Sequence, residues 1–177
     1  MSKGYSGLFG GTKGILVAVP GEAVFESYVL TSRGTKDYTY FRNIAHRNDV
    51  DANGVYDVVA HGSPDKIQIE HNGNNMLINS RTLAHLLKAD NKYGNKQSIR
   101  LLSCSTGTDA KGFAQNLANK LNVIVYAPTD MVGAYPSGRY IVAPRLSNDP
   151  NNPRYNFPDT SKNKRGKFIP FKPGGNK

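Results

Sequence analysis

VYDVVAHGS (residues 55–63) and SIRLLSC (residues 98–104) are the two stretches that decide the fold predicted for this chain. Each is a short run of mostly apolar and β-branched residues, which is typical of a strand buried in a sheet. The first run stops at His61 and the second at Cys104, which is the only cysteine in the sequence. In both places a predicted strand therefore ends at a reactive side chain.

Amphipathic and apolar segments alternate along the middle of the chain. Residues 66–73 are predicted to form a short exposed strand or a hairpin, and a helix is predicted from Ser80 or Asn79 to about Ala89. A second helix is predicted to begin at Thr108 or Asp109 and to carry Phe113, Leu117 and Leu121 on one face, and a strand is predicted at 123–128. Short apolar strands that alternate with such helices indicate an α/β fold, in which a mostly parallel central sheet is covered by helices on both faces.

Composition divides the chain into three segments. Residues 1–13 form a Gly-rich, flexible lead-in, residues 14–145 hold the single domain, and residues 146–177 form a basic tail rich in Asn and Pro. We expect the tail to be irregular and to rest on the domain through four aromatic residues: Tyr155, Phe157, Phe168 and Phe171.

The outer parts of the domain have weaker patterns. Residues 14–21 are predicted to form a buried strand, residues 22–33 a helix or a strand, and residues 36–44 and 138–144 further strands.

Charge and cysteine content narrow the possible functions. The formal net charge of +10 favours acidic partners such as nucleic acid, an anionic metabolite or an acidic protein. A single cysteine makes neither an internal disulfide nor a multi-cysteine zinc site, so we expect no metal and no cofactor. The sequence has no apolar run long enough to span a membrane and no apolar signal core at its start.

Reactive groups in an open parallel sheet gather beyond the carboxyl ends of the strands, where His61 and Cys104 both fall. An imidazole beside a thiol accepts its proton, which makes the sulfur a nucleophile. We expect the positive end of the helix near Asp109 to lower the thiol pKa further, and the amides of Gly62 and Cys104 to hold a developing oxyanion. Asp130, past the third strand, is a candidate for a specificity pocket.

Each of these residues also has a structural interpretation. A lone cysteine after an apolar strand is often a small buried hydrophobe, and a histidine at a strand end is often a surface residue. Asp130 follows Pro-Thr and suits a turn. The basic cluster KNKRGK (residues 162–167) suits a solvated tail as well as an anion-binding surface.

VVAHGS, the later IRLLSC, the helix GFAQNLANKL and the strand VIVYAP together resemble the caspase-like cysteine peptidases of clan CD. The resemblance is strongest to the self-cleaving cysteine protease domains of large bacterial toxins and to C-terminal domains of polymorphic toxins. It covers about residues 55–128. It implies a three-layer caspase–hemoglobinase fold and a cysteine endopeptidase, in which His61 matches the catalytic histidine, Cys104 the nucleophile, and Gly62 the residue after the histidine.

The chain also departs from this group. The caspase sequence around the nucleophile is absent, and no acidic residue that would orient His61 is identifiable. As a toxin or effector domain, the chain is expected to be secreted or delivered into a target cell as the C-terminal part of a larger protein, and to act in a reducing cytoplasm. The resemblance further implies a protein or peptide substrate, an acidic immunity protein as partner and an anionic activator.

Two other classes of function remain open from the sequence. A basic toxin that cleaves RNA would use Lys and Arg to contact phosphates, and His61 or His71 for acid–base catalysis. A binding module would only be held by an acidic partner. The cysteine peptidase is favoured because it uses both strand ends.

Overall fold

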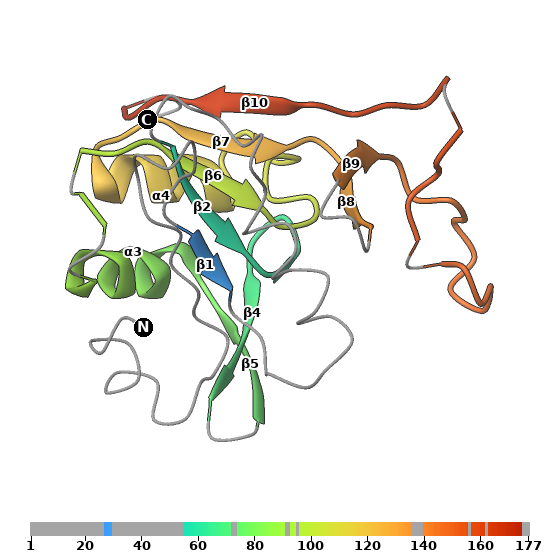
Figure 1. Cartoon of the computed structure of the whole chain (residues 1–177), viewed down its shortest axis with the longest axis horizontal. Coiled ribbons are helices and arrows are strands. Elements are labelled where there is room, and N and C mark those ends of the chain that lie inside the picture. The colour runs from blue at the N-terminus through green and yellow to red at the C-terminus, as the bar shows by residue number, and fades with distance from the viewer. Residues whose placement is uncertain are drawn as a thin grey trace.

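The computed structural model describes residues 27–29, 55–71, 74–90, 93–94, 96–135, 140–155, 157–161 and 163–174. Its central sheet has the strand order β1-β2-β6-β7-β10 (Figure 1). These strands are β1 (Ser27–Val29), β2 (Tyr56–Val59), β6 (Ile99–Leu102), β7 (Val125–Pro128) and β10 (Phe168–Phe171). The first four are parallel to their neighbours, and β10 is antiparallel to β7. The predicted mixed α/β fold with a mostly parallel sheet is thus confirmed.

Among the described residues, two helices connect parallel strands. Helix α3 spans Ser80–Ala89 between β2 and β6, and the side chain of Asn79 caps it by accepting from the Thr82 N–H at 2.9 Å. This agrees with the predicted start. Helix α4 spans Phe113–Leu121 between β6 and β7.

The predicted start of the second helix at Thr108 or Asp109 is wrong. The Thr108 N–H donates to the Ser105 carbonyl at 3.2 Å, and the Gly112 N–H donates to the Asp109 carbonyl at 3.0 Å. These hydrogen bonds close separate turns, and the Asp109 side chain caps the amide of Lys111 at 2.9 Å instead of a helix. Helix α4 therefore begins only at Phe113.

Both described helices cover the same face of the sheet. Inward residues of α3 and α4 belong to one buried apolar cluster with alternate residues of the strands, among them Val58 on β2, Leu101 on β6 and Val125 on β7. The strand order β2-β6-β7 advances in one direction, so right-handed crossovers bring the two described helices to one side, and helices on both faces, as predicted, are not seen among the described residues. In Figure 1 the two helices lie next to each other beside the sheet.

Two smaller sheets extend from the central one. Strands β3 (His61–Gly62), β4 (Ile67–His71) and β5 (Asn74–Ile78) form an antiparallel meander. Strand β4 confirms the strand or hairpin predicted at 66–73, but its hairpin partner β5 runs on to Ile78, and Ile67 and Ile69 are buried, not exposed. Strands β8 (Met131–Ala134) and β9 (Tyr140–Ala143) form a second hairpin, and β9 confirms the strand predicted at 138–144.

The sequence predicted an irregular tail, but one part of it is a regular strand. Phe168–Phe171 form β10, which pairs with β7 from Phe168↔Pro128 to Phe171↔Val125. Pro170 lacks an N–H, and an edge strand tolerates that loss because one of its sides has no partner strand. Phe171 is buried against the helical face of the sheet, so the end of the tail completes the domain.

Several predictions concern segments at the start of the chain. Residues 27–29 form β1, which supports a strand rather than a helix within 22–33. The lead-in at 1–13 and the strands predicted at 14–21 and 36–44 lie outside the described residues. Among the described residues, no helix is both long and apolar enough to cross a membrane.

Candidate functional site

The backbone brings the ends of β2 and β6 together at the predicted site. The two strands pair in parallel up to Val59↔Leu102, and the Ala60 N–H donates to the Leu102 carbonyl at 3.4 Å. Beyond this point Gly62 lies against the Cys104 turn: a Cβ built on Gly62 would be 2.9 Å from the carbonyl oxygen of Cys104. Only a glycine fits there, so His61 is held next to the turn that carries the thiol.

His61 lies on the exposed side of this junction. It opens β3, where it pairs with Gln68 of β4, and its side chain is exposed. The histidine thus stands at the solvent-facing edge of the site.

The Cys104 thiol is half-buried and rests against the backbone of β8. The Val132 N–H donates to Sγ at 3.3 Å, and Sγ lies 3.6 Å from the Val132 carbonyl oxygen, to which it donates. Burial raises the pKa of Cys104 above its ordinary value, while the Val132 N–H and the positive charge of Arg145 act in the opposite direction. The expected lowering of the thiol pKa is therefore wrong for this arrangement.

The start of α4 explains in part why the helix does not lower the pKa of Cys104. Two backbone amides at the start of α4 already donate hydrogen bonds. The Phe113 N–H donates to the Pro64 carbonyl at 2.9 Å, and the Ala114 N–H donates to the Thr106 carbonyl at 3.3 Å. The helix thereby ties the loop after His61 to the loop after Cys104. Its positive end stabilises these two carbonyl groups, and the thiol pKa is governed by burial.

The serines on either side of Cys104 carry unusual local structure. Ser105 has a φ of 61°, in the left-handed region that costs energy for a residue other than glycine. Ser103 is 0 % exposed, and its Oγ is the one buried side-chain polar atom without a hydrogen-bond partner among the described residues. Strain and an unpaired buried hydroxyl are both costly, and both are common at functional sites.

Asp130 is placed near this turn but its carboxylate is already in contact with its neighbours. Its backbone carbonyl accepts the Ser105 N–H at 2.8 Å, and its Oδ2 accepts from the Thr129 hydroxyl at 2.8 Å. Gly166 of the tail packs directly on the same Oδ2. A role for Asp130 in a specificity pocket stays a prediction, and it would require the tail to move.

Arg145 is the residue near the thiol that the sequence did not reveal. Its guanidinium lies over the ring of Tyr155, 4.1 Å from the centroid, and its Nη1 donates to the Tyr155 carbonyl at 2.9 Å. Apart from its place after β9, the sequence contains no signal for this arrangement, because the contact depends on how the tail folds back.

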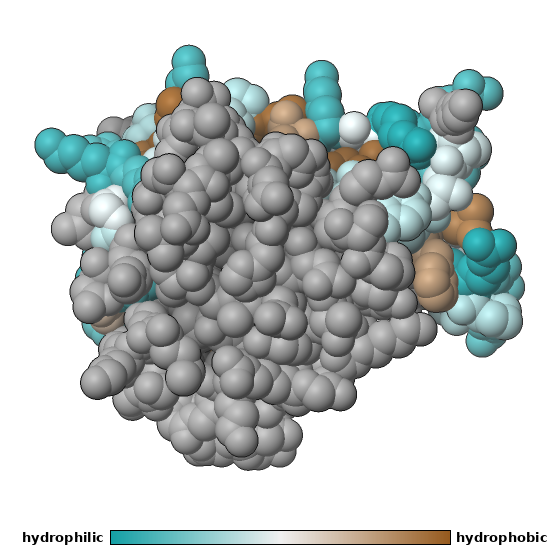
Figure 2. Space-filling view, in the orientation of Figure 1, coloured by the Kyte–Doolittle hydropathy of each residue, from teal (hydrophilic) through white to brown (hydrophobic). Residues whose placement is uncertain are grey.

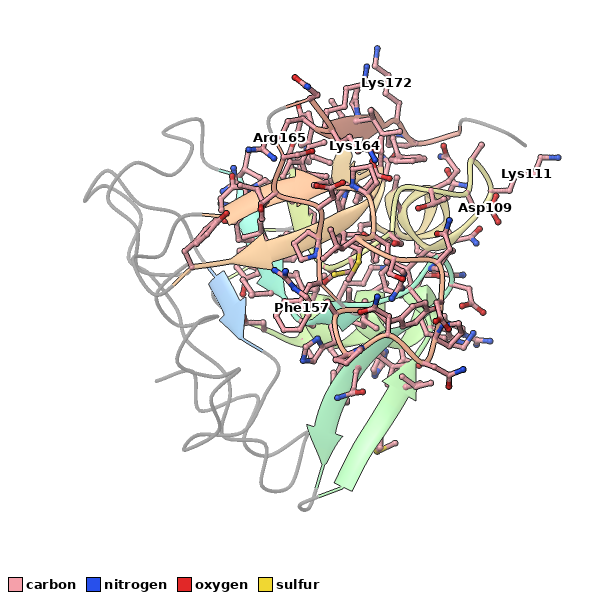
Figure 3. All side chains as sticks on the ribbon, turned by 90° about the vertical axis from the view of Figure 1, so that its right-hand side faces the viewer. Asp109, Lys111, Phe157, Lys164, Arg165 and Lys172 are labelled. Atoms are coloured by element: carbon pink, nitrogen blue, oxygen red, sulfur yellow. The ribbon has the colours of Figure 1, made fainter. Side chains whose placement is uncertain are left out.

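The tail beside Arg145 also exposes apolar surface. Leu146 is 37 % exposed and Phe157 55 % exposed, and the Leu146 N–H donates to the Phe157 carbonyl at 2.9 Å. Brown patches stand among teal ones at the right-hand edge of Figure 2, over the chain that follows β9. Figure 3 shows Phe157 apart from the cations Lys164 and Arg165 of the same tail.

Across the described residues, no group of three or more His, Cys, Asp or Glu side chains is arranged to hold a metal ion.

Comparison with known proteins identifies a family. Residues 29–142 match the family described as Domain of unknown function (DUF8616), a span that runs from β1 into β9 and includes His61 and Cys104. No curated protein and no solved structure matches the chain. Since the match covers more than half of the sequence, the chain belongs to the DUF8616 family.

Proposed function

We propose that this protein is a cysteine endopeptidase of caspase-like, three-layer fold, with Cys104 as the nucleophile and His61 as the general base. The observation that carries the proposal is the packing of Gly62 against the Cys104 carbonyl. This contact supports the proposal because it holds the two strand ends at one edge of the sheet, where the thiol and the imidazole are proposed to act on the same substrate.

The reaction follows from the chemistry of the two groups. The thiol proton passes to the imidazole of His61 as Sγ bonds to the substrate carbonyl carbon. The amides of Gly62 and Cys104 are proposed to stabilise the negative oxygen that forms. The imidazolium then protonates the leaving amine as the C–N bond breaks, and water hydrolyses the acyl-enzyme to release the acid and the free thiol.

The thiol has to leave its contact with β8 before it attacks. In the resting arrangement burial raises the pKa of Cys104, and its hydrogen bonds run to Val132. A substrate strand that displaces the Val132 contact would turn the sulfur toward His61. The resting enzyme is accordingly proposed to be weakly reactive until a substrate or activator is bound.

The biological setting remains a proposal of the same kind. The net charge of +10 suits an acidic immunity protein and an anionic activator, since opposite charges speed association. A toxin or effector domain delivered into a target cytoplasm would keep its single cysteine reduced.

A cleavage assay with matched variants tests the proposal. Purified protein is incubated with a proteome-derived peptide mixture, and new termini are identified by mass spectrometry for the wild type, Cys104→Ala and His61→Ala. We expect cleavage by the wild type only. The same proteins are incubated with total RNA. RNA cleavage that survives Cys104→Ala, with no peptide cleavage, would overturn the proposal in favour of a nuclease.

A further inference from the structure

Ser103 lies between the two strand ends that form the candidate site. It is the residue after β6, its side chain is fully buried, and a Cβ built on Gly62 would be 2.9 Å from the Ser103 Cβ. The serine side chain therefore packs against Gly62, whose amide is proposed to hold the oxyanion. Its neighbour Cys104 contacts Val132 instead, so the hydroxyl and the thiol have different surroundings.

The backbone of Ser103 is held in place. Strand β6 pairs with β2 as far as Leu102, and the Thr106 hydroxyl donates to the Ser103 carbonyl at 2.9 Å. The Thr106 side chain is itself fully buried and faces Gly62, since its Cγ2 would lie 3.0 Å from a Cβ built there. Only rotation about the Cα–Cβ bond is left to the Ser103 side chain, so its Oγ stays beside the backbone around Gly62.

The resting structure does not pair the Ser103 hydroxyl. Its Oγ is buried and has no hydrogen-bond partner among the described residues. A buried hydroxyl without a partner lowers stability, whereas an alanine at the same position would fill almost the same space without this cost. The sequence thus keeps a group that folding alone does not favour, which points to a partner in another state of the site.

The peptide between His61 and Gly62 has the geometry of such a partner. The bond is trans, so its N–H and C=O point in opposite directions. Substrate arrives from the solvent side, where His61 is exposed, while Ser103 lies on the buried side. A Gly62 N–H that turns toward a substrate oxygen therefore turns the His61 carbonyl inward, toward the Ser103 hydroxyl. Strand β3 consists only of these two residues, and a glycine tolerates such a rotation.

We infer that Ser103 is a positioning residue, which donates a hydrogen bond to the His61 carbonyl in the reacting state and so holds the Gly62 amide toward the oxyanion. A hydroxyl donor suits a carbonyl acceptor, and the low dielectric of the buried side strengthens the bond. The inference rests on the proposed peptidase and adds to it a group that acts only through the backbone of His61 and Gly62.

The test compares two reactions of the Cys104 thiol, in both of which the thiol gives up its proton to His61. With p-nitrophenyl acetate, Sγ bonds to the acetyl carbonyl carbon, the carbonyl oxygen becomes negative, and p-nitrophenolate then leaves, so the reaction uses the oxyanion site. With iodoacetamide, Sγ displaces iodide from a methylene carbon, and no oxyanion forms. Both rates are measured in the wild type, Ser103→Ala and Ser98→Ala, after subtraction of the rate in Cys104→Ala.

We expect Ser103→Ala to slow acylation by p-nitrophenyl acetate about tenfold or more, to change alkylation less than about twofold, and to melt at or above the wild-type temperature. Ser98→Ala alters the serine just before the opposite end of β6 and should leave both rates unchanged. Equal slowing of both reactions in Ser103→Ala would give this residue a structural role, and unchanged acylation would give it none. Either result overturns the inference and leaves the peptidase proposal intact. Acylation of the wild type no faster than that of Cys104→Ala would overturn both.

Discussion

Arg100 on β6 holds the fully buried carboxylate of Asp57 on β2 with two hydrogen bonds, Nε to Oδ1 at 2.8 Å and Nη2 to Oδ2 at 2.6 Å. The two residues are direct partners in the parallel pairing of these strands. The guanidinium also lies near two rings, 5.7 Å from the centroid of Tyr140 and 6.0 Å from that of Phe168. The pair thus links β2 and β6, the two strands that lead to His61 and Cys104, to β9 and β10.

Removing only the Asp57 side of the Asp57–Arg100 pair should lower the stability of the fold. Asp57→Leu removes the buried carboxylate that pairs with the partly buried Arg100, and we expect a loss of about 3–5 kcal/mol in the free energy of unfolding. The double variant D57L/R100M removes both charges and should recover most of that loss. Urea denaturation of the single and double variants measures both. Equal stability of Asp57→Leu and the wild type would contradict the role given to the pair.

Gly62→Ala should disturb the candidate site directly. The added Cβ would meet the Cys104 carbonyl oxygen and the Ser103 Cβ at 2.9 Å, both on a fixed backbone. We expect a loss of about 1–3 kcal/mol in stability and a changed alkylation rate at Cys104. Gly94→Ala is the matched control, since its nearest contact would be the flexible Gln97 Oε1 at 3.7 Å. The same behaviour in both variants would argue against the close approach.

The Cys104 thiol should lose its proton at a higher pH in the folded protein than in the unfolded one. Burial raises the pKa of Cys104, so between the two pKa values the folded state keeps its proton. The stability that this contributes is fully present below the unfolded pKa and is lost as pH rises through the folded one. The pH profile of iodoacetamide alkylation, with and without urea, measures the difference. A native profile that lies at lower pH would contradict it.

Arg145 should influence the pH at which the Cys104 thiol loses its proton. Its positive charge favours the thiolate, so Arg145→Gln is expected to move the alkylation profile to still higher pH. Arg154→Gln removes an exposed arginine of the same tail and serves as the control. If both variants shift the profile equally, the effect belongs to net charge and not to the position of Arg145.

The helix cap at Asn79 offers a smaller, local test. Asn79→Ala removes the acceptor for the Thr82 N–H and should lower stability by about 1 kcal/mol, as other cap deletions do. Asn79→Asp keeps the acceptor and should retain the wild-type stability. Thermal unfolding of the two variants distinguishes the cap from a general effect of substitution.

Local patterns in the sequence were sufficient for much of the fold. Helix α3 carries its own signals, with a cap at Asn79 and leucines at helical spacing, so it could be predicted without knowledge of its partners. The two buried strands could be recognised for the same reason. Their parallel pairing followed from the alternation of strands and helices.

The rest depends on contacts between distant segments. Strand β10 contains Pro170 in a Pro-rich tail, and only the open edge of β7 makes it a strand. The contact of Val132 with the thiol and the position of Arg145 depend on how β8, β9 and the tail fold back. The second helix was predicted too early because Asp109 looks like a helix cap but caps a turn.

Alkylation of Cys104 in His61→Ala tests the central claim most directly. We expect iodoacetamide to react with the thiol once it leaves its contact with Val132, and a nearby base to raise the reactivity of the released thiol. We predict an alkylation rate at neutral pH about tenfold or more below wild type in His61→Ala. Lys66→Ala, which removes a partly exposed cation from the turn between β3 and β4, should react at the wild-type rate. Equal rates in the wild type and His61→Ala would contradict the pairing of His61 with Cys104.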